Sequence, residues 1–300
     1  MNDAHPLRCE TCGAELIPDS RFCEQCGSRA GADADPASDT KDDRIELDLG
    51  AVAAVSERGR THPRNDDAFY LERIGESVVA VVCDGVSTSI SADLAAKRTA
   101  TGVGGVLAEA LSTGAQTPRV AIADAIAFAQ SAVRRLKSTT RADLADPACT
   151  LVAAIWHEDE LVLSWLGDSR AYWLGDTEAR QLTVDNSWAS EQVAAGILSA
   201  TEAAADPRAR SITRWVGADA PPEPPQLVTL HPADVGLLVL CSDGLWMYMP
   251  EARTIARLVS GLPTTASPLA VARSLADRAR ARGGADDITV AVVDVRPQGG

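Results

Sequence analysis

The sequence lacks any apolar run approaching the ~20 residues that a membrane-spanning helix requires. Residues 1–18 show no basic flank followed by an apolar stretch, so no secretory signal is expected. The cysteines number seven, which is odd, and three of them are scattered through apolar text. These features indicate a reducing compartment, and we expect a cytoplasmic protein that does not associate with membranes.

Positive charge is also in short supply. Lys and Arg total 28 against 42 Asp and Glu, which gives a net charge of −14 and a pI near 4.7. Nucleic-acid-binding surfaces need clustered Lys and Arg, so this balance disfavours nucleic acid as a partner. An excess of carboxylates suits a protein that collects divalent cations, although solubility alone would also account for it.

Four of the cysteines stand together near the N-terminus in two Cys-x-x-Cys pairs. Each pair lets two thiolates reach one ion, so two pairs predict a tetrahedral zinc site within a ribbon over residues 1–29. The expected ligands are Cys9, Cys12, Cys23 and Cys26. Disulfides or a redox pair are the alternatives, and the missing signal and the lack of a nearby strand-helix unit disfavour both.

The ribbon itself carries three Arg and five acidic residues, a net charge of −2. This charge disfavours a phosphate backbone as its partner, and we expect a protein-interaction or regulatory role. Residues 30–44 are rich in Asp and contain almost no large apolar side chain, which predicts a flexible acidic linker. The main domain is expected over residues 45–296.

Apolar runs and alternations in this main domain predict strands first, then helices, then strands again. Strands are expected at 45–56, 77–85, 150–156, 160–167, 170–174, 226–231, 235–244 and 288–295. Helices are expected at 91–111, 118–141, 251–259 and 268–282. This order favours an α+β layered sandwich over an alternating parallel sheet.

Acidic turns stand at the ends of several of these strands. They are Asn65-Asp66-Asp67, Asp84-Gly85, Asp243-Gly244 and Asp286-Asp287. A single Asp-Gly is usually only a turn, but four acidic turns at strand ends point to a shared cleft. Carboxylates gathered in one cleft repel each other unless cations lie between them, and all-oxygen ligands favour Mg²⁺ or Mn²⁺.

The ordered motifs resemble the metal-dependent, type 2C serine/threonine protein phosphatases in their bacterial form, over about residues 50–295. The matching text is SERGRTHPRNDDAF, VVAVVCDGVS, LSWLGDSRAYWL, LTVDNS, ITRWVG, LLVLCSDGLW and GGADDITVAVV. The resemblance implies an α-β-β-α sandwich, in which helices flank two antiparallel sheets and the metals lie in a cleft at one end.

The resemblance also implies a role for each acidic position. Two Mn²⁺ or Mg²⁺ ions would hold a bridging hydroxide that attacks phosphoserine or phosphothreonine in line, without a covalent enzyme intermediate. Asp84 would bridge the ions, and Asp67 would act through bound water. The remaining ligands would be Asp66, the Gly85 carbonyl, Asp243 and Asp286. The substrates would be phosphorylated proteins, in opposition to serine/threonine kinases, and we expect a monomer.

Two positions depart from the family pattern. His62 stands where most members have a phosphate-binding arginine, so Arg64 or Arg60 is a candidate substitute, since an arginine fork grips phosphate better than imidazole does. His62 is alternatively an acid for the leaving alkoxide or a structural residue. Many bacterial members bind a third metal through an acid just before the strand that starts here at Ala148. Asp146 is the nearest acid but is offset by one place from that position, and a turn at Asp146-Pro147 is the alternative.

Two other functions compete with this interpretation. The text from Gly167 to Ala171 nearly matches a nucleophile elbow, which would make Ser169 the nucleophile of a serine hydrolase. An elbow needs a helix after the turn, whereas a strand is expected here. The second alternative is a non-catalytic pseudophosphatase that serves as an interaction module. It is disfavoured because all the main acidic positions are filled.

Overall fold

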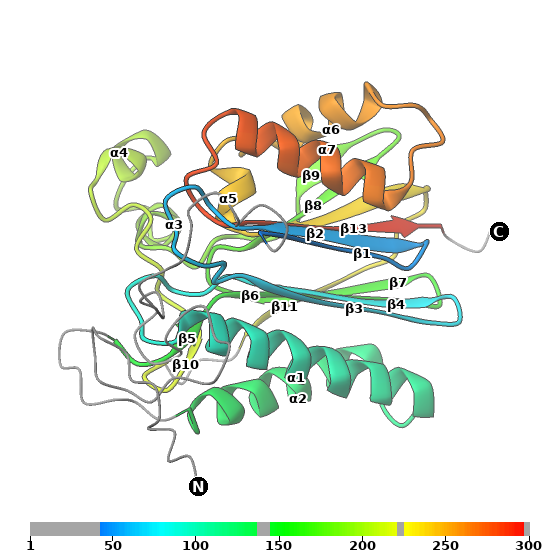
Figure 1. Cartoon of the computed structure of the whole chain (residues 1–300), viewed down its shortest axis with the longest axis horizontal. Helices are drawn as coiled ribbons and strands as arrows, with labels where there is room; N and C mark the ends of the chain where they lie inside the picture. The colour runs from blue at the N-terminus through cyan, green and yellow to red at the C-terminus, as the bar shows by residue number, and fades with distance from the viewer. Residues whose placement is uncertain (1–42, 137–144, 221–224, 297–300) are drawn as a thin grey trace, which may run out of the picture.

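The computed structural model describes residues 43–136, 145–220 and 225–296. Two antiparallel sheets stack face to face, and a helical layer covers the outer face of each (Figure 1). This arrangement confirms the predicted α-β-β-α sandwich. The expected zinc ribbon and nearly all of the linker lie outside the described residues.

The first sheet has six strands and is antiparallel throughout. In spatial order its strands are β1 (Arg44–Asp48), β2 (Val52–Glu57), β13 (Ile288–Val295), β12 (Gly236–Cys241), β8 (Arg170–Gly175) and β9 (Ala179–Gln181).

The second sheet has five strands and is also antiparallel. Its order is β11 (Gln226–Leu230), β7 (Glu160–Leu166), β6 (Leu151–His157), β4 (Ser77–Cys83) and β3 (Ala68–Ile74). A separate two-stranded pair joins β5 (Ala148–Cys149) to β10 (Val216–Gly217).

Two pairs of helices form the outer layers. α1 (Ala92–Thr113) and α2 (Pro118–Val133) cover the five-stranded sheet, and α6 (Ala252–Ser260) and α7 (Pro268–Ala281) cover the six-stranded sheet (Figure 1). Proline at the first position of α2 and α7 leaves no unsatisfied amide there, and the Ser267 hydroxyl caps α7 by accepting a hydrogen bond from Ala270 N. Among the described residues, no helix is both long and apolar enough to cross a bilayer.

Three short helices lie toward one end of the sandwich. They are α3 (Trp188–Ala194), α4 (Ala200–Ala205) and α5 (Asp243–Trp246), and α3 and α4 lie at the left of Figure 1. The Ser187 hydroxyl caps α3, and a reciprocal capping box between Ser199 and Glu202 begins α4.

Both faces of the central strands are buried, which explains their continuous apolar text. In β4, Val79 and Val81 belong to the core beneath α1 and α2, whereas Ala80 and Val82 belong to the core between the sheets. A third core lies between the six-stranded sheet and α6 and α7, where Leu275 is fully buried. In a sheet that is covered on both faces, every side chain of a central strand is buried. The alternation of apolar and polar residues is therefore absent from the sequence of these strands.

The sequence expectations for the elements need correction at several places. The helix expected at 118–141 ends at Val133. The single strand expected at 45–56 is two strands, because the chain turns at Gly50, where φ is +79°. β3 and the short β9 were not predicted, since β3 mixes apolar and charged residues. α3 and α4 were also missed, because the apolar periodicity over 186–214 is weak. Cys83, Cys149 and Cys241 are buried free thiols, as their apolar context suggested.

Candidate metal centre

Antiparallel pairing brings the acidic turns to one end of the sandwich. Ala68 at the start of β3 pairs with Cys83 at the end of β4, so Asp67 and Asp84 are neighbours. In the other sheet, Cys241 at the end of β12 pairs with Val290 near the start of β13. The acids that precede β3 and β13 therefore meet the acids that follow β4 and β12 at the same edge.

Asp287 organises the loop that carries the first acids. Its Oδ1 accepts a hydrogen bond from Gly59 N at 2.6 Å, and its Oδ2 accepts one from Asp66 N at 2.7 Å. The side chain is only 2% exposed. A carboxylate that accepts two buried amides fixes the loop in place, although the sequence analysis gave Asp287 no role of its own.

His62 lies between two carboxylates. Its Nδ1 is 3.0 Å from Asp287 Oδ2, and its Nε2 is 3.4 Å from Asp286 Oδ1. The hydrogen bond to Asp287, aided by the charges of Asp287, Asp286 and Asp66, raises the pKa of His62 to about 9 against the opposing effect of burial. The ligand atoms of these three side chains also lie close enough together to hold a metal ion.

Arg64 is held by two acids and is largely buried. Its Nε donates to Asp66 Oδ1 at 2.6 Å, and its second terminal nitrogen is 3.0 Å from Asp93 Oδ1 on α1. The guanidinium is thus committed to orienting Asp66. Burial raises the pKa of Asp66, and the Arg64 charge opposes this rise.

Burial and neighbouring carboxylates raise the pKa values of three further carboxyl groups. Burial raises the pKa of Asp84 well above its usual range, and the charges of Asp67 and Asp243 add to the rise. The pKa of Asp67 is also raised, first by burial and then by the charge of Asp287. Burial and the charges of Asp286 and Asp168 raise the pKa of Asp243 to about 8. This cluster of negative groups favours either protons or cations.

Asp67 gives a second indication that the cluster lacks a positive partner. Its amide donates to Asn65 Oδ1 at 3.0 Å, and Asn65 Nδ2 donates to Ser56 Oγ at 2.9 Å. The side chain is 5% exposed, yet Oδ2 has no hydrogen-bond partner among the described residues. An orphaned buried carboxylate oxygen is costly unless water or an ion meets it.

Asp168 belongs to the cluster, although sequence reasoning did not include it. It is 8% exposed at the turn between β7 and β8, and its charge contributes to the raised pKa values of Asp84 and Asp243. Burial, aided by the charge of Asp185, raises its own pKa to about 6. Asp146, predicted for a third metal, lies next to Pro147 just before β5.

Close backbone approach at the cluster requires glycine at two positions. Gly85 N donates to Asp66 O at 3.2 Å, and a Cβ on Gly85 would lie 2.6 Å from that oxygen. A Cβ on Gly244 would lie 1.9 Å from the carbonyl oxygen of Asp287. The glycines that follow Asp84 and Asp243 therefore permit each strand-end loop to approach the acidic loop before a neighbouring strand, β3 for Gly85 and β13 for Gly244.

Ser169 is not a nucleophile. It is 1% exposed, its Oγ is 2.7 Å from Thr150 Oγ1, and strand β8 follows it directly. The nucleophile elbow considered above needs an exposed serine before a helix, so the structure excludes it.

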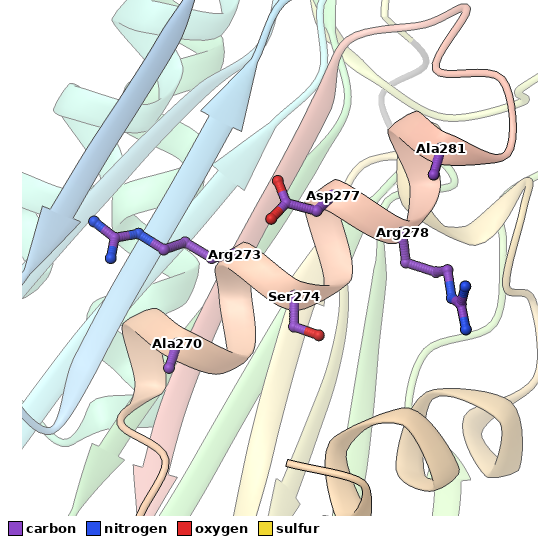
Figure 2. A pocket seen from close by; sticks show the side chains of 6 residues that line it. All are labelled: Ala270, Arg273, Ser274, Asp277, Arg278 and Ala281. Atoms are coloured by element: carbon purple, nitrogen blue, oxygen red, sulfur yellow. The ribbon is translucent and has the colours of Figure 1, made fainter. Parts of the chain in front are cut away.

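A separate hollow of about 530 Å³ lies along the outer face of α7, and it takes no part in the acid cluster. All the side chains that Figure 2 labels come from this one helix. Two of them are tied to β1, because Arg273 donates to Glu46 Oε2 at 2.9 Å and Asp277 accepts from Arg44 at 2.5 Å.

Comparisons with known proteins agree on one family. A family model described as "Protein phosphatase 2C" matches residues 56–278. The serine/threonine phosphatase stp of Listeria innocua is 28% identical over 247 residues, covering 80% of this chain and 93% of that protein. The S. agalactiae serine/threonine phosphatase structure has a TM-score of 0.68 at 25% identity, covering 84% of this chain and all of that one. The catalytic domain of PstP in complex with two manganese ions has a TM-score of 0.63 at 24% identity, covering 84% and 98%.

Proposed function

Because this chain belongs to the protein phosphatase 2C family and is a serine/threonine protein phosphatase, we propose that its acid cluster is a binuclear Mn²⁺ or Mg²⁺ centre. The centre would serve to hydrolyse phosphoserine and phosphothreonine on proteins. The main support is the set of raised carboxyl pKa values around Asp84, Asp67 and Asp243. The donors are all oxygen, which fits Mn²⁺ or Mg²⁺.

The residues that would hold the ions are those at the strand ends. They are Asp66, Asp84, the Gly85 carbonyl, Asp243 and Asp286, with Asp67 acting through water. When bound, the two ions supply a water of lowered pKa and neutralise the charge of the phosphate. The protein contributes rigidity, because Arg64 holds the Asp66 carboxylate and Asp287 holds the Asp66 amide.

A third cation would be served better by Asp168 than by Asp146. Asp168 is buried, and its charge acts on Asp243 as well as on Asp84. Asp146 is a second candidate, and it precedes Pro147 just before β5. We infer that Asp243 and Asp168 would share such an ion.

Neither His62 nor Arg64 has a free charge for the substrate phosphate, since carboxylates of the cluster occupy both. Arg210 is exposed beside the cluster, and its charge lowers the pKa values of Asp243 and Asp168. The Arg210 guanidinium donates a hydrogen bond to Met247 Sδ at 3.4 Å. We infer that Arg210, rather than His62, binds the substrate phosphate.

Since phosphoserine and phosphothreonine are the products of protein kinases, the enzyme would oppose serine/threonine kinases. The zinc ribbon proposed for residues 1–29 would bind a protein. The test of catalysis is release of phosphate from p-nitrophenyl phosphate and from a phosphothreonine peptide. Release should require Mn²⁺ and stop with a chelator. A folded protein that binds Mn²⁺ but releases no phosphate would be a pseudophosphatase.

A further inference from the structure

An apolar groove lies between the two short helices α3 and α4. It has a volume of about 410 Å³, and none of its lining residues is charged. Val184, Val193 and Ala200 lie along it, and the first two are 60% and 40% exposed. Exposed valines around a hollow gain free energy when another apolar group covers them.

The groove adjoins a polar pocket that reaches Asp168 of the acid cluster. This second pocket, also about 410 Å³, is lined by Asp168 and Arg210. Ala189, Ser190 and Ala204 line both hollows. A chain bound with its phosphate at the acids could extend past Asp168 and Arg210 to the residues that both hollows share.

The groove is held to the sheets by specific contacts. Asn186, just before α3, accepts a hydrogen bond from Gly167 N at 3.0 Å and donates to Gln226 Oε1 at 2.9 Å. The Arg208 guanidinium lies 4.1 Å from the centre of the Trp188 ring at the start of α3. A groove so anchored is preorganised, which reduces the entropic cost of binding.

We propose that this groove is a substrate subsite that binds an aliphatic side chain, such as leucine, near the phosphorylated residue of the protein substrate. The proposal rests on the phosphatase function proposed above and adds a specificity to it. The wall that the groove shares with the polar pocket beside Asp168 and Arg210 selects the substrate chain as the occupant. The absence of charge from the groove lining selects an apolar side chain.

The test uses phosphothreonine peptides with an alanine background and a single leucine. The leucine is moved one position at a time along both sides of the phosphothreonine, and kcat/KM is measured with Mn²⁺. One position should give about a 10-fold higher kcat/KM than alanine, the lower end of what a hydrophobic pocket discriminates. Glutamate at that position should give no gain.

Variants of the groove then test where the preference arises. Val193→Asp places a charge in the groove, and Ala200→Met fills it from the other helix, so each should reduce the leucine-to-alanine ratio of kcat/KM to near 1. The matched control is Val235→Asp, a valine 47% exposed in the loop before β12, which should keep the ratio. The ratio is independent of the fraction of folded enzyme.

Three results would overturn the subsite. A wild-type enzyme with no preferred leucine position, or a ratio that survives both groove variants, would contradict the subsite while leaving the phosphatase intact. Absence of turnover with both p-nitrophenyl phosphate and every peptide would instead contradict the proposed function, and the subsite with it.

Discussion

His62 Nδ1 lies 3.0 Å from Asp287 Oδ2, and 225 residues separate the two in the chain. The same carboxylate oxygen accepts the Asp66 amide. His62, which was expected to contact the substrate, thus binds the carboxylate that supports the loop carrying Asp66. The first prediction follows from this pair.

We expect His62→Ala to destabilise the protein in a pH-dependent way. The pKa of His62 is raised from 6.5 to about 9, so the pair stabilises the folded state fully below pH 6.5 and loses this effect as pH rises through 9. At ~1.4 kcal/mol per pKa unit, the loss at low pH is about 3 kcal/mol at most. Urea unfolding in a chelator across this pH range measures it.

The exposed His231 provides the control for that series, and His231→Ala should change the free energy of unfolding little at any pH. If the difference between wild type and His62→Ala stayed constant from pH 6 to pH 10, the ion pair would not be its cause. Unchanged kcat and KM for a phosphopeptide would further exclude a direct catalytic role for His62.

We expect the metal-free protein to lose stability as pH rises from about 4 to 8. The Asp243 carboxyl has its pKa raised from 3.8 to about 8, so across this interval the folded state binds more protons than the unfolded state. The slope of the free energy of unfolding against pH is then negative. Thermal melts in a chelator should show a falling Tm, and saturating Mn²⁺ should remove most of the fall, since it binds the folded state.

Asp84→Asn and Asp243→Asn should each lower the activity of the enzyme and raise the stability of the metal-free protein. Each should lower Mn²⁺-dependent phosphate release by more than about 100-fold, because changes that only support a metal ligand already cost 10–100-fold. Each should also raise the Tm of the metal-free protein near pH 8, since one repelling carboxylate is gone.

The control for these two variants is Asp234→Asn, an exposed acid in the loop before β12, which should change neither quantity. Full activity in Asp84→Asn would contradict its place at the centre of the site.

Arg210→Ala should raise KM more than it lowers kcat and should reduce kcat/KM for a phosphothreonine peptide by about 10-fold. A charge-assisted hydrogen bond to phosphate is worth about 1.5–3 kcal/mol, and exposure brings the effect to the low end. Arg210→Lys should recover part of the loss. Arg119→Ala on the outer side of α2 is the matched charge control. An unchanged KM in Arg210→Ala would return the phosphate-binding role to other residues.

The zinc proposed for the N-terminal cysteines should be independent of the catalytic metals. Elemental analysis should find one zinc per chain in wild type and in Asp84→Asn. Cys9→Ser combined with Cys23→Ser should abolish zinc while Mn²⁺-dependent turnover of p-nitrophenyl phosphate continues. Zinc retained in the double serine variant would exclude the four-cysteine site.

The sequence was most informative where chemistry follows from residue type and local position. Buried strands ending in Asp-Gly, at Asp84 and Asp243, indicated carboxylates in a cleft, and the structure brings them together with Asp67 and Asp286. The layered α+β fold was predictable because the apolar runs are long and the helices are strongly patterned. The weaker patterns of β3, α3 and α4 were missed because their burial is partial.

By itself, then, the sequence determined the fold class, the protein phosphatase family and the acids available to hold metal, since these depend on short motifs in a fixed order. Only the tertiary structure decided what those acids contact. Side chains from distant strands and loops meet at the cluster. They make Asp287 the anchor of the loop, Asp168 a member of the cluster and Arg210 the exposed cation beside it. The antiparallel register of the strands determines which of these side chains lie close together. No local pattern of residues encodes a distance across two sheets.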